Sequence, residues 1–295
     1  MADPEKWELL ALQQEFDWVL QHEVPSAIRR LRVVIEECAR HFPQSVAKIV
    51  TPPKLEKFVM ATASHNAQDS IKCIVTVLGD NITHADITIK LHKNTSQYHG
   101  QLQTEWKLQQ TQDSANHLQT CCYFLDSLDD GQVKSAEEAM HALNQVIAYL
   151  HKGRNCLIIP KKRTIDDLVS SRNMKSLIPN LPSDLTISFY IQAHKLIFAV
   201  YLLSQQQGHV KFETFQADCS VPWLNEVIVL YSDALQLCQQ LKDKIMVFSQ
   251  YKDANLLGSH CASPDSWEME GKGIIVPGEG SGRPGMTGAG DGPPT

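Results

Sequence analysis

The chain has 295 residues, of which 43% are hydrophobic and 20% charged, the composition of an ordinary globular protein. Its net charge of −6 excludes the overall basic field of a general nucleic-acid binder, so we expect no nucleic-acid partner. The N-terminal residues include acids and no apolar run, and the apolar stretch 185–203 contains Gln192, His194 and Lys195. We therefore expect neither a secretory signal nor a membrane span.

Residues 5–41 predict a helix. Apolar side chains recur from Leu20 to Cys38 at alternating steps of four and three residues, which is typical of one face of a bundle helix. Pro25 lies inside this pattern. Because proline removes a helical hydrogen bond, we expect a kink or a restart there.

The period changes to two between residues 55 and 92. Residues 71–78 are apolar on both faces, which suits a central strand, and residues 85–92 alternate cleanly between apolar and polar. The turn-forming sequence Gly79-Asp80-Asn81 lies between them. Residues 56–63 predict a third strand.

Two helices follow, from about residue 104 to residue 153. Asp129-Asp130-Gly131 ends the first of them, and Ser135 with Glu138 forms a capping box that begins the second. Because the loop is short, the two helices are expected to pack as an antiparallel hairpin.

Residues 154–183 are interpreted as a connector with a short helix at 165–172, capped by Thr164 with Asp167. Residues 185–192 alternate as a strand does. The run 195–203 has no clear period and fits either a partner strand or a helix; we favour a hairpin that turns at Ala193-His194.

The last long element begins at Pro222, where a missing N–H costs nothing. Leu224 and Val227 each begin a series of apolar residues spaced seven apart, and these heptads indicate a coiled-coil-like bundle helix. The tail, residues 258–295, is rich in Gly and Pro and is predicted to be disordered.

Together these elements predict an α+β fold: an elongated antiparallel four-helix bundle with a small, mostly antiparallel β-sheet domain inserted at one end. The predicted helical domain comprises residues 5–42, 104–153 and 222–251, and the β domain residues 55–92 and 184–216. The apolar residues expected to form the bundle seam are Leu20, Val24, Leu31, Val34, Leu108, Leu118, Leu125, Leu143, Val146, Leu150, Leu224, Val227, Tyr231, Ala234, Cys238, Leu241, Ile245 and Phe248.

Motifs that carry chemistry are missing from the sequence. There is no phosphate-binding glycine loop and no nucleophile elbow, so we expect no catalytic residue, cofactor or metal. His117 and Cys121 share one helix face, but two ligands do not make a metal site. The eight cysteines are scattered and are interpreted as reduced residues that fill the core. Asp166-Asp167 is interpreted as helix capping rather than acid–base chemistry.

Five side chains are candidates for partner contacts. Trp106 and Trp223 lie at the predicted helix starts, where they either anchor a partner or fill the junction between helices and sheet. Lys161, Lys162 and Arg163 form a basic run that is either a localisation signal, a lipid-headgroup contact or a solvated loop, the last being favoured.

Residues 221–251 (VPWLNEVIVLYSDALQLCQQLKDKIMVFSQY) and 105–118 (EWKLQQTQDSANHL) resemble two signatures of the Rogdi family. Residues 181–203 and 15–24 are also similar, so the resemblance covers roughly residues 8–251. Two features depart from it: Pro25, and the glycine-rich tail beyond about residue 257.

The resemblance implies a helical domain with a β domain and a function without catalysis. Rogdi proteins have been called leucine-zipper proteins and are related to the second subunit of RAVE, a complex that promotes assembly of the vacuolar proton pump, the V-ATPase. The implied function is therefore an adaptor in a RAVE-like complex that promotes vesicle acidification. The implied partners are WD-repeat DmX-like proteins and the cytosolic sector of the V-ATPase.

The implied location is cytoplasmic, peripheral on synaptic or other acidic vesicles, with membrane association only through partners and a further pool at the nuclear envelope. The alternative is a leucine-zipper protein that self-associates and acts as a structural or nuclear regulator. This alternative requires the apolar heptad positions of residues 224–248 to be exposed in the monomer. Weak self-association is expected at most.

Overall fold

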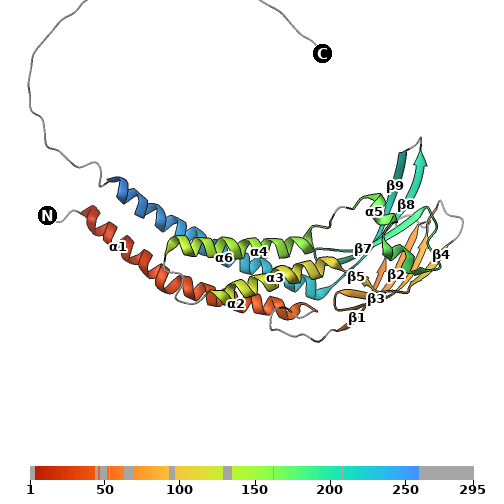
Figure 1. Ribbon diagram of the computed structural model, residues 1–295, viewed down its shortest axis with the longest axis horizontal. Helices are drawn as coiled ribbons and strands as arrows, with labels where there is room; N and C mark the ends of the chain where they lie inside the picture. The colour runs from red at the N-terminus through yellow and green to blue at the C-terminus, as the bar shows by residue number, and fades with distance from the viewer. Residues whose placement is uncertain are drawn as a thin grey trace, which may run out of the picture. The chain divides into compact units, whose positions relative to one another are not determined.

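The computed structural model describes residues 4–43, 46, 52, 54–62, 69–92, 97–128, 135–161, 163–206 and 209–258. The chain divides into two units, Met1–Ala254 and Asn255–Thr295, and the fold described here is that of the first. Helices form one layer of this unit, and a curled antiparallel sheet adjoins one end of them (Figure 1). The helices are α1 (Pro4–Trp18), η1 (Val19–Glu23), α2 (Val24–His41), α3 (Gln109–Ser127), α4 (Ala136–Ile158), α5 (Ile165–Val169), η2 (Arg172–Ser176) and α6 (Pro222–Gly258).

The predicted kink or restart at Pro25 takes the form of a restart: the π-helical segment η1 ends at Glu23, and α2 begins at Val24. Helix α1 passes into η1 and then α2 without leaving helical backbone angles, and Pro25 occupies the second position of α2. Because proline lacks an N–H and its ring crowds the carbonyl four residues earlier, a regular α-helix cannot continue through it. The helix instead has one extra residue in this turn, so that the N–H of Val24 donates to the carbonyl of Val19, five residues earlier.

The first and last helices lie side by side in opposite directions. Phe16 stacks on Phe248 with 5.7 Å between ring centroids, Lys244 Nζ lies 2.5 Å from Glu23 Oε1, and His41 Nδ1 lies 2.8 Å from Glu226 Oε2. As the residue numbers increase along α1 and α2, the numbers of their contact partners on α6 decrease, so the helices are antiparallel. The apolar stripe of α2 and the heptads of α6 bury each other, which stabilises both helices.

Tyr231 joins three helices at one point. Its ring is fully buried in α6, and its hydroxyl lies 3.1 Å from the Ser114 hydroxyl and 3.2 Å from the Ser114 carbonyl oxygen on α3. Gly153 of α4 gives the ring its space, because a Cβ there would lie 2.5 Å from the tyrosine oxygen. The predicted helix ends at residue 153, whereas α4 continues to Ile158 and needs a glycine at this position for packing.

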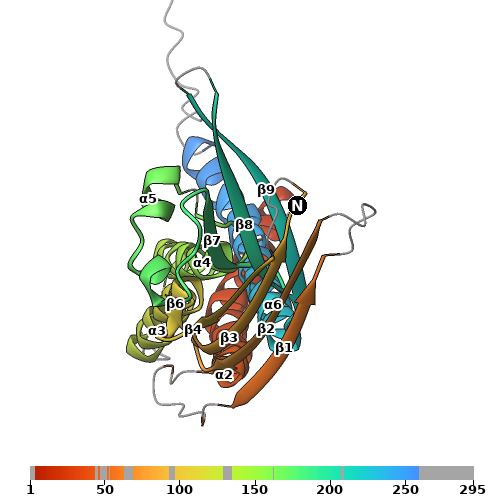
Figure 2. The same ribbon diagram turned by 90° about the vertical axis from the view of Figure 1, so that its right-hand side faces the viewer.

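The described strands form one nine-stranded antiparallel sheet. The order along the main path is β6-β4-β3-β2-β1-β9-β8-β7, and β5 pairs with β3. Figure 2 shows these strands twisting and curling across the end of the helices. The strands are β1 (Leu55–Ala61), β2 (Ser70–Leu78), β3 (Asn81–Lys90), β4 (Tyr98–Leu102), β5 (Trp106–Lys107), β6 (Leu177–Ile178), β7 (Leu185–Gln192), β8 (Lys195–Gln206) and β9 (His209–Ser220).

The predicted four-helix bundle with a small sheet at one end is wrong. The sheet is a major part of the protein. It includes segments to which the sequence analysis assigned no structure, and others that it assigned to a helix or to the connector. Strand β9 continues to Ser220, β5 takes residues expected to begin a helix, and β6 lies inside the predicted connector 154–183. The domain boundaries themselves stay a prediction.

Several local predictions are confirmed. The hairpin β7–β8 turns at Ala193 and His194, with Gln192 opposite Lys195 and a left-handed φ of 55° at Ala193. Gly79 has a φ of 67° in the turn between β2 and β3, a conformation that favours glycine. Capping boxes begin α4 at Ser135 and α5 at Thr164.

Helices and sheet share one hydrophobic core. The same buried cluster contains Ile35 of α2, Leu118 of α3, Cys73 of β2, Phe198 of β8 and Leu224 of α6. Surfaces on the helices and on the sheet are therefore held in a fixed relation to each other.

Candidate functional site

The residues predicted to line the bundle seam lie in the core. Leu20, Val24, Leu31, Leu108, Leu118, Leu125, Leu143, Val146, Leu150, Leu224, Val227, Tyr231, Ala234, Cys238, Leu241 and Ile245 are buried, and Val34 and Phe248 are partly buried against the same cluster. The heptad positions of α6 are thus covered by other helices of the same chain, which leaves them unavailable for a zipper between molecules.

The two tryptophans named as candidate partner contacts fill internal junctions. Trp106 of β5 is 3% exposed, and its ring meets the edge of Phe189 at 5.2 Å. Trp223 is partly buried at the start of α6, with its ring 5.9 Å from Phe42. The packing interpretation therefore describes both side chains better than the anchor interpretation.

Two residues of the basic run, Lys161 and Arg163, line a pocket of about 540 Å³; Lys162 lies outside the described residues. The pocket is bounded by the start of α3, the segment that links α4 to α5, and strands β7 to β9. Its lining residues are Lys107, Leu108, Gln109, Gln110, Pro160, Lys161, Arg163, Thr164, Leu168, Ser188, Phe189, Tyr190, Tyr201 and Phe212. This volume is in the range of known ligand pockets.

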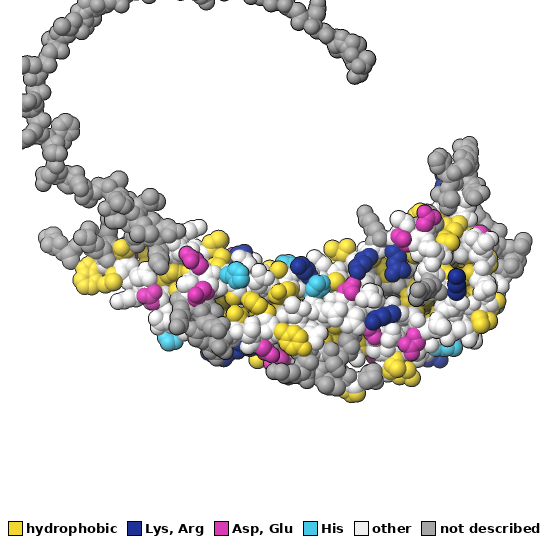
Figure 3. Space-filling view, viewed as in Figure 1, with side chains coloured by type: hydrophobic (Ala, Val, Ile, Leu, Met, Phe, Trp, Pro, Cys, Tyr) yellow, Lys and Arg dark blue, Asp and Glu magenta, His cyan; other side chains and the backbone are white. Residues whose placement is uncertain are grey.

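The described lining residues of the pocket include three cationic side chains and no carboxylate. Lys161 Nζ lies 2.6 Å from Asp113 Oδ2, and Lys107 Nζ lies 3.8 Å from Asp80 Oδ2. Within the described part of the chain, Arg163 has no ion pair of this kind. Figure 3 shows lysine and arginine side chains gathered where the helices meet the sheet.

The ion pair between Lys161 and Asp113 fixes the connecting segment to α3. Partial burial acts to raise the pKa of Asp113, but hydrogen bonds from Gln109 and Lys161 outweigh it and hold this pKa below its ordinary value. The hydrogen bond to Asp113 in turn raises the pKa of Lys161. Both groups are therefore charged throughout the physiological range.

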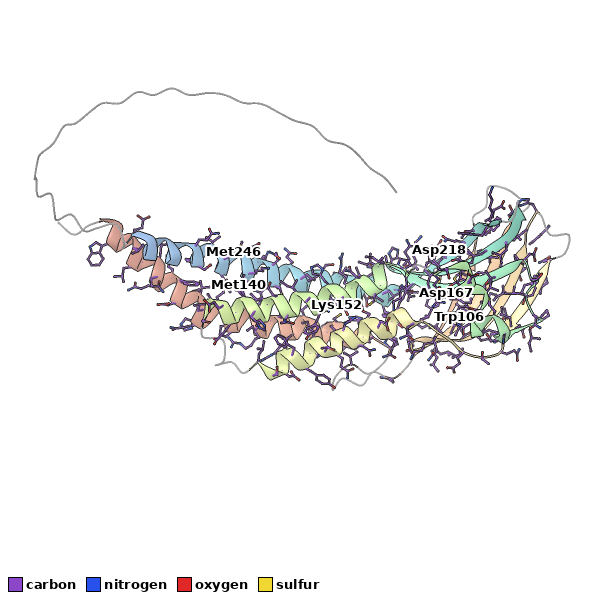
Figure 4. All side chains as sticks on the ribbon, turned by 45° about the horizontal axis from the view of Figure 1, so that its top comes forward. Trp106, Met140, Lys152, Asp167, Asp218 and Met246 are labelled. Carbon is purple, nitrogen blue, oxygen red and sulfur yellow. The ribbon has the colours of Figure 1, made fainter. Side chains whose placement is uncertain are left out.

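Arg163 lines the pocket together with Thr164, which caps α5, and Tyr201 of β8. Hydrogen bonds within the Thr164 capping box lower the pKa of Asp167, and the charge of Arg163 adds to this effect. Burial raises the pKa of Tyr201, while the same arginine opposes that rise. Figure 4 shows Asp167 and Trp106 at the end of the helices where the sheet begins.

Gln110 closes part of the exposed edge of β7. Its side chain accepts the Ile191 N–H at 2.7 Å and donates to the Ile191 carbonyl at 2.8 Å, as a neighbouring strand would. The same amide donates to the Cys156 carbonyl at 3.0 Å. That carbonyl has no helical partner because the residue four positions on is Pro160, which lacks an N–H.

The described residues offer no cluster of metal ligands and no activated cysteine nucleophile. No group of three or more His, Cys, Asp or Glu residues that could hold a metal occurs there, and His117 with Cys121 does not form one. The seven described cysteines are free thiols. Burial raises the pKa of Cys122 and Cys219 to about 11 and that of Cys238 to about 12, so these thiols stay protonated.

Sequence reasoning found two residues of the pocket, Lys161 and Arg163, but missed the pocket itself. Its other walls come from strands β7 to β9, whose pairing brings Tyr190, Tyr201 and Phe212 together. The only signal in the sequence was a basic run that follows a helix and precedes a capping box, and that pattern alone favours a solvated loop.

A curled antiparallel sheet packed on long helices, with a basic and aromatic pocket at the junction, defines a mixed α and β protein. The family model described as "Rogdi leucine zipper containing protein" matches residues 15–218. "Protein rogdi" of Drosophila melanogaster is 48% identical over 257 residues, which cover 86% of this chain and 94% of the relative. The "Protein rogdi homolog" sequences of Danio rerio and Homo sapiens are 32% and 31% identical over 274 residues, covering 83% of this chain and 95% and 94% of the relatives.

The chain belongs to the Rogdi family, and the resemblance recognised in the sequence is confirmed. Neither the family description nor the names of these relatives carries an enzymatic activity. Among the described helices, none combines the length and the hydropathy that crossing a bilayer requires.

Proposed function

We propose that this protein is a non-catalytic adaptor subunit of a RAVE-like complex that promotes V-ATPase assembly and vesicle acidification. Its partners in this role are WD-repeat DmX-like proteins and the cytosolic sector of the pump. It acts in the cytoplasm, peripheral on synaptic or other acidic vesicles, and reaches the membrane through these partners; a further pool lies at the nuclear envelope.

The observation that carries the proposal is the single core shared by helices and sheet. An adaptor must hold two partners at a fixed separation and orientation, and a frame whose parts are packed together does this without losing binding energy to hinge motion. The hydrogen bond of Tyr231 to Ser114 joins α6 to α3. The hydrogen bonds of Gln110 join α3 to Cys156 of α4 and to Ile191 of the sheet. Membership in the Rogdi family supports the particular partners.

The described surface also offers contact area. Large apolar side chains are exposed on both parts of the frame, among them Trp7 and Trp18 on α1 at 64% and 57%, Val33 on α2 at 65%, and Val59 on β1 at 59%. Tryptophan is among the residues that most often anchor protein interfaces, so Trp7 and Trp18 are the candidates for partner contact.

Affinity purification from cells tests the proposal. The tagged full chain is expected to recover a DmX-like protein together with V-ATPase cytosolic subunits, in amounts that an unrelated tagged protein does not match. Depletion of the protein is expected to slow reacidification of vesicles, and re-expression to restore it. A purification that recovers neither class of partner would count decisively against the proposal.

A self-associating zipper is less well supported. That function needs exposed apolar heptads on residues 224–248, yet Leu224, Tyr231 and Ile245 are completely buried in the core of the chain. Light scattering that finds a stable dimer would nevertheless favour it.

A further inference from the structure

The pocket beside the basic run has one cation available to an incoming group. Lys161 and Lys107 are engaged by Asp113 and Asp80, two carboxylates outside the pocket lining, whereas Arg163 makes no such pair within the described part of the chain. A single available guanidinium matches one carboxylate, which it can bind through two parallel hydrogen bonds. A highly charged anion would meet too little positive charge here, because Asp113, Asp80 and Asp167 lie close by.

An apolar surface lies next to this cation. Phe212 of β9 lines the pocket yet is 51% exposed, and its ring meets Tyr201 of β8 at 6.2 Å in an edge contact. Leu168 of α5 is the aliphatic part of the same lining. A large apolar side chain of a ligand would therefore cover Phe212 while a neighbouring carboxylate reached Arg163.

The edge of β7 adds main-chain groups. In an antiparallel strand, residues two apart direct their N–H and C=O to the same side, so Phe189 faces the side on which Gln110 binds Ile191. Among the described residues no hydrogen bond involves these outward groups of Phe189, and Phe189 lines the pocket. Although Phe189 is only 5% exposed, one peptide group of a ligand can pair with it, next to the pair that the Gln110 side chain makes with Ile191.

We infer that this pocket, formed by Arg163, Phe212, Leu168 and the edge of β7 at Phe189, binds an extended peptide segment of a partner protein that carries a carboxylate side chain beside a large apolar one. The inference deepens the proposed adaptor function, on which it rests, by naming the chemistry of one partner contact. The carboxylate sets orientation, the apolar side chain supplies buried area, and the backbone pairs with β7.

Selection from a random heptapeptide library displayed on phage, with the purified full-length protein as bait, tests the inference. The enriched peptides are expected to carry Asp or Glu next to Trp, Phe or Leu. The most enriched sequence, made synthetically, is expected to bind the Arg163→Glu variant at least about tenfold more weakly, because a charge-assisted hydrogen bond is lost. Arg163→Lys keeps the positive charge but loses the paired N–H donors of the guanidinium, and it is expected to weaken binding by an intermediate factor.

Arg30→Glu is the matched control. Arg30 is exposed on α2, outside the pocket lining, so the same charge reversal there is expected to change peptide binding less than about twofold. Phe212→Ala tests the apolar half and is expected to weaken binding without altering the preference for a carboxylate. Urea midpoints of all variants verify that each is folded.

Three outcomes would overturn the inference: no enrichment of any sequence, enriched peptides that lack a carboxylate, or equal binding by wild type and Arg163→Glu. In a fourth outcome, peptide selection shows no preference, and wild type but not Arg163→Glu binds vesicles that contain phosphatidylserine. This outcome would assign the pocket to membrane binding instead. If wild type still recovers DmX-like and pump subunits while peptide selection fails, the inference is wrong and the adaptor function stands. If wild type recovers neither, the adaptor function itself fails.

Discussion

Replacing Gln110 with Ala is expected to weaken the whole fold, although the side chain is polar and makes no ion pair. Its amide satisfies three backbone groups: the buried N–H and carbonyl of Ile191 at 2.7 and 2.8 Å, and the partly buried carbonyl of Cys156 at 3.0 Å. Removing one partner of a buried hydrogen bond costs about 1–3 kcal/mol, and these three losses share one cavity and are not additive. We therefore expect the free energy of unfolding to fall by about 3 kcal/mol.

Urea denaturation followed by circular dichroism measures this change. With a urea m-value of about 3 kcal/mol/M, the midpoint is expected to fall by about 1 M at unchanged m. Gln110→Met fills the space without hydrogen bonds and is expected to lose most of the same stability. Gln112→Ala is the matched control, since that amide donates to Asn116 on the helix surface, and its effect should stay within about 0.5 kcal/mol. A loss below about 1 kcal/mol for Gln110→Ala would refute the reasoning, because water would then be satisfying the β7 edge.

Three further predictions concern the helices and the pocket rim. Tyr231→Phe removes the hydroxyl contact to Ser114 and is expected to cost about 1–2 kcal/mol by urea denaturation; an unchanged midpoint would contradict it. Arg32→Ala leaves the carbonyls of Leu125 and Leu128 at the C-terminus of α3 without the donor at 2.8 and 2.6 Å, and is expected to lower the free energy of unfolding by about 2 kcal/mol. Because the pKa of Asp113 is lowered in the folded state, its stabilising contribution is present above its unfolded pKa of about 3.9 and is lost as the pH falls through the lower folded value. Asp113→Asn is therefore expected to be less stable than wild type at pH 7, by a difference that shrinks as the pH falls below about 4. A difference that does not change with pH would contradict this.

The sequence was most informative where one local pattern decides the structure. The seven-residue spacing from Leu224 onward identifies a buried helix face because the helical period fixes which residues share a side. The capping box at Ser135 and the two-residue turn at Ala193 depend on neighbouring residues alone, and both occur as predicted. The interpretation of Trp106 as a junction residue also describes its place in the core.

The size of the sheet was underestimated because several strands have weak local patterns. In β9 the apolar residues change phase between Phe212 and Phe215, so the alternation that marks a strand is broken. Strands β5 and β6 have two residues each and exist only because longer strands offer them a partner.

The pocket was missed for a related reason. Lys107, Arg163 and Phe212 are about fifty residues apart from one to the next, and only the pairing of β7 to β9 and the packing of α3 bring them together. A pattern within a short window carries no information about such distances. The basic run alone therefore pointed to an ordinary loop.

The shared core also determines when the protein can fold during its synthesis. Strand β1 adjoins β9, and α2 packs along α6, so segments made early are completed by segments made last. Until α6 has left the ribosome, the apolar stripe of α2 lacks the helix that buries it, and exposed apolar surface of this kind is prone to aggregation. A premature stop before residue 222 would therefore be expected to yield an aggregating chain rather than a shortened adaptor.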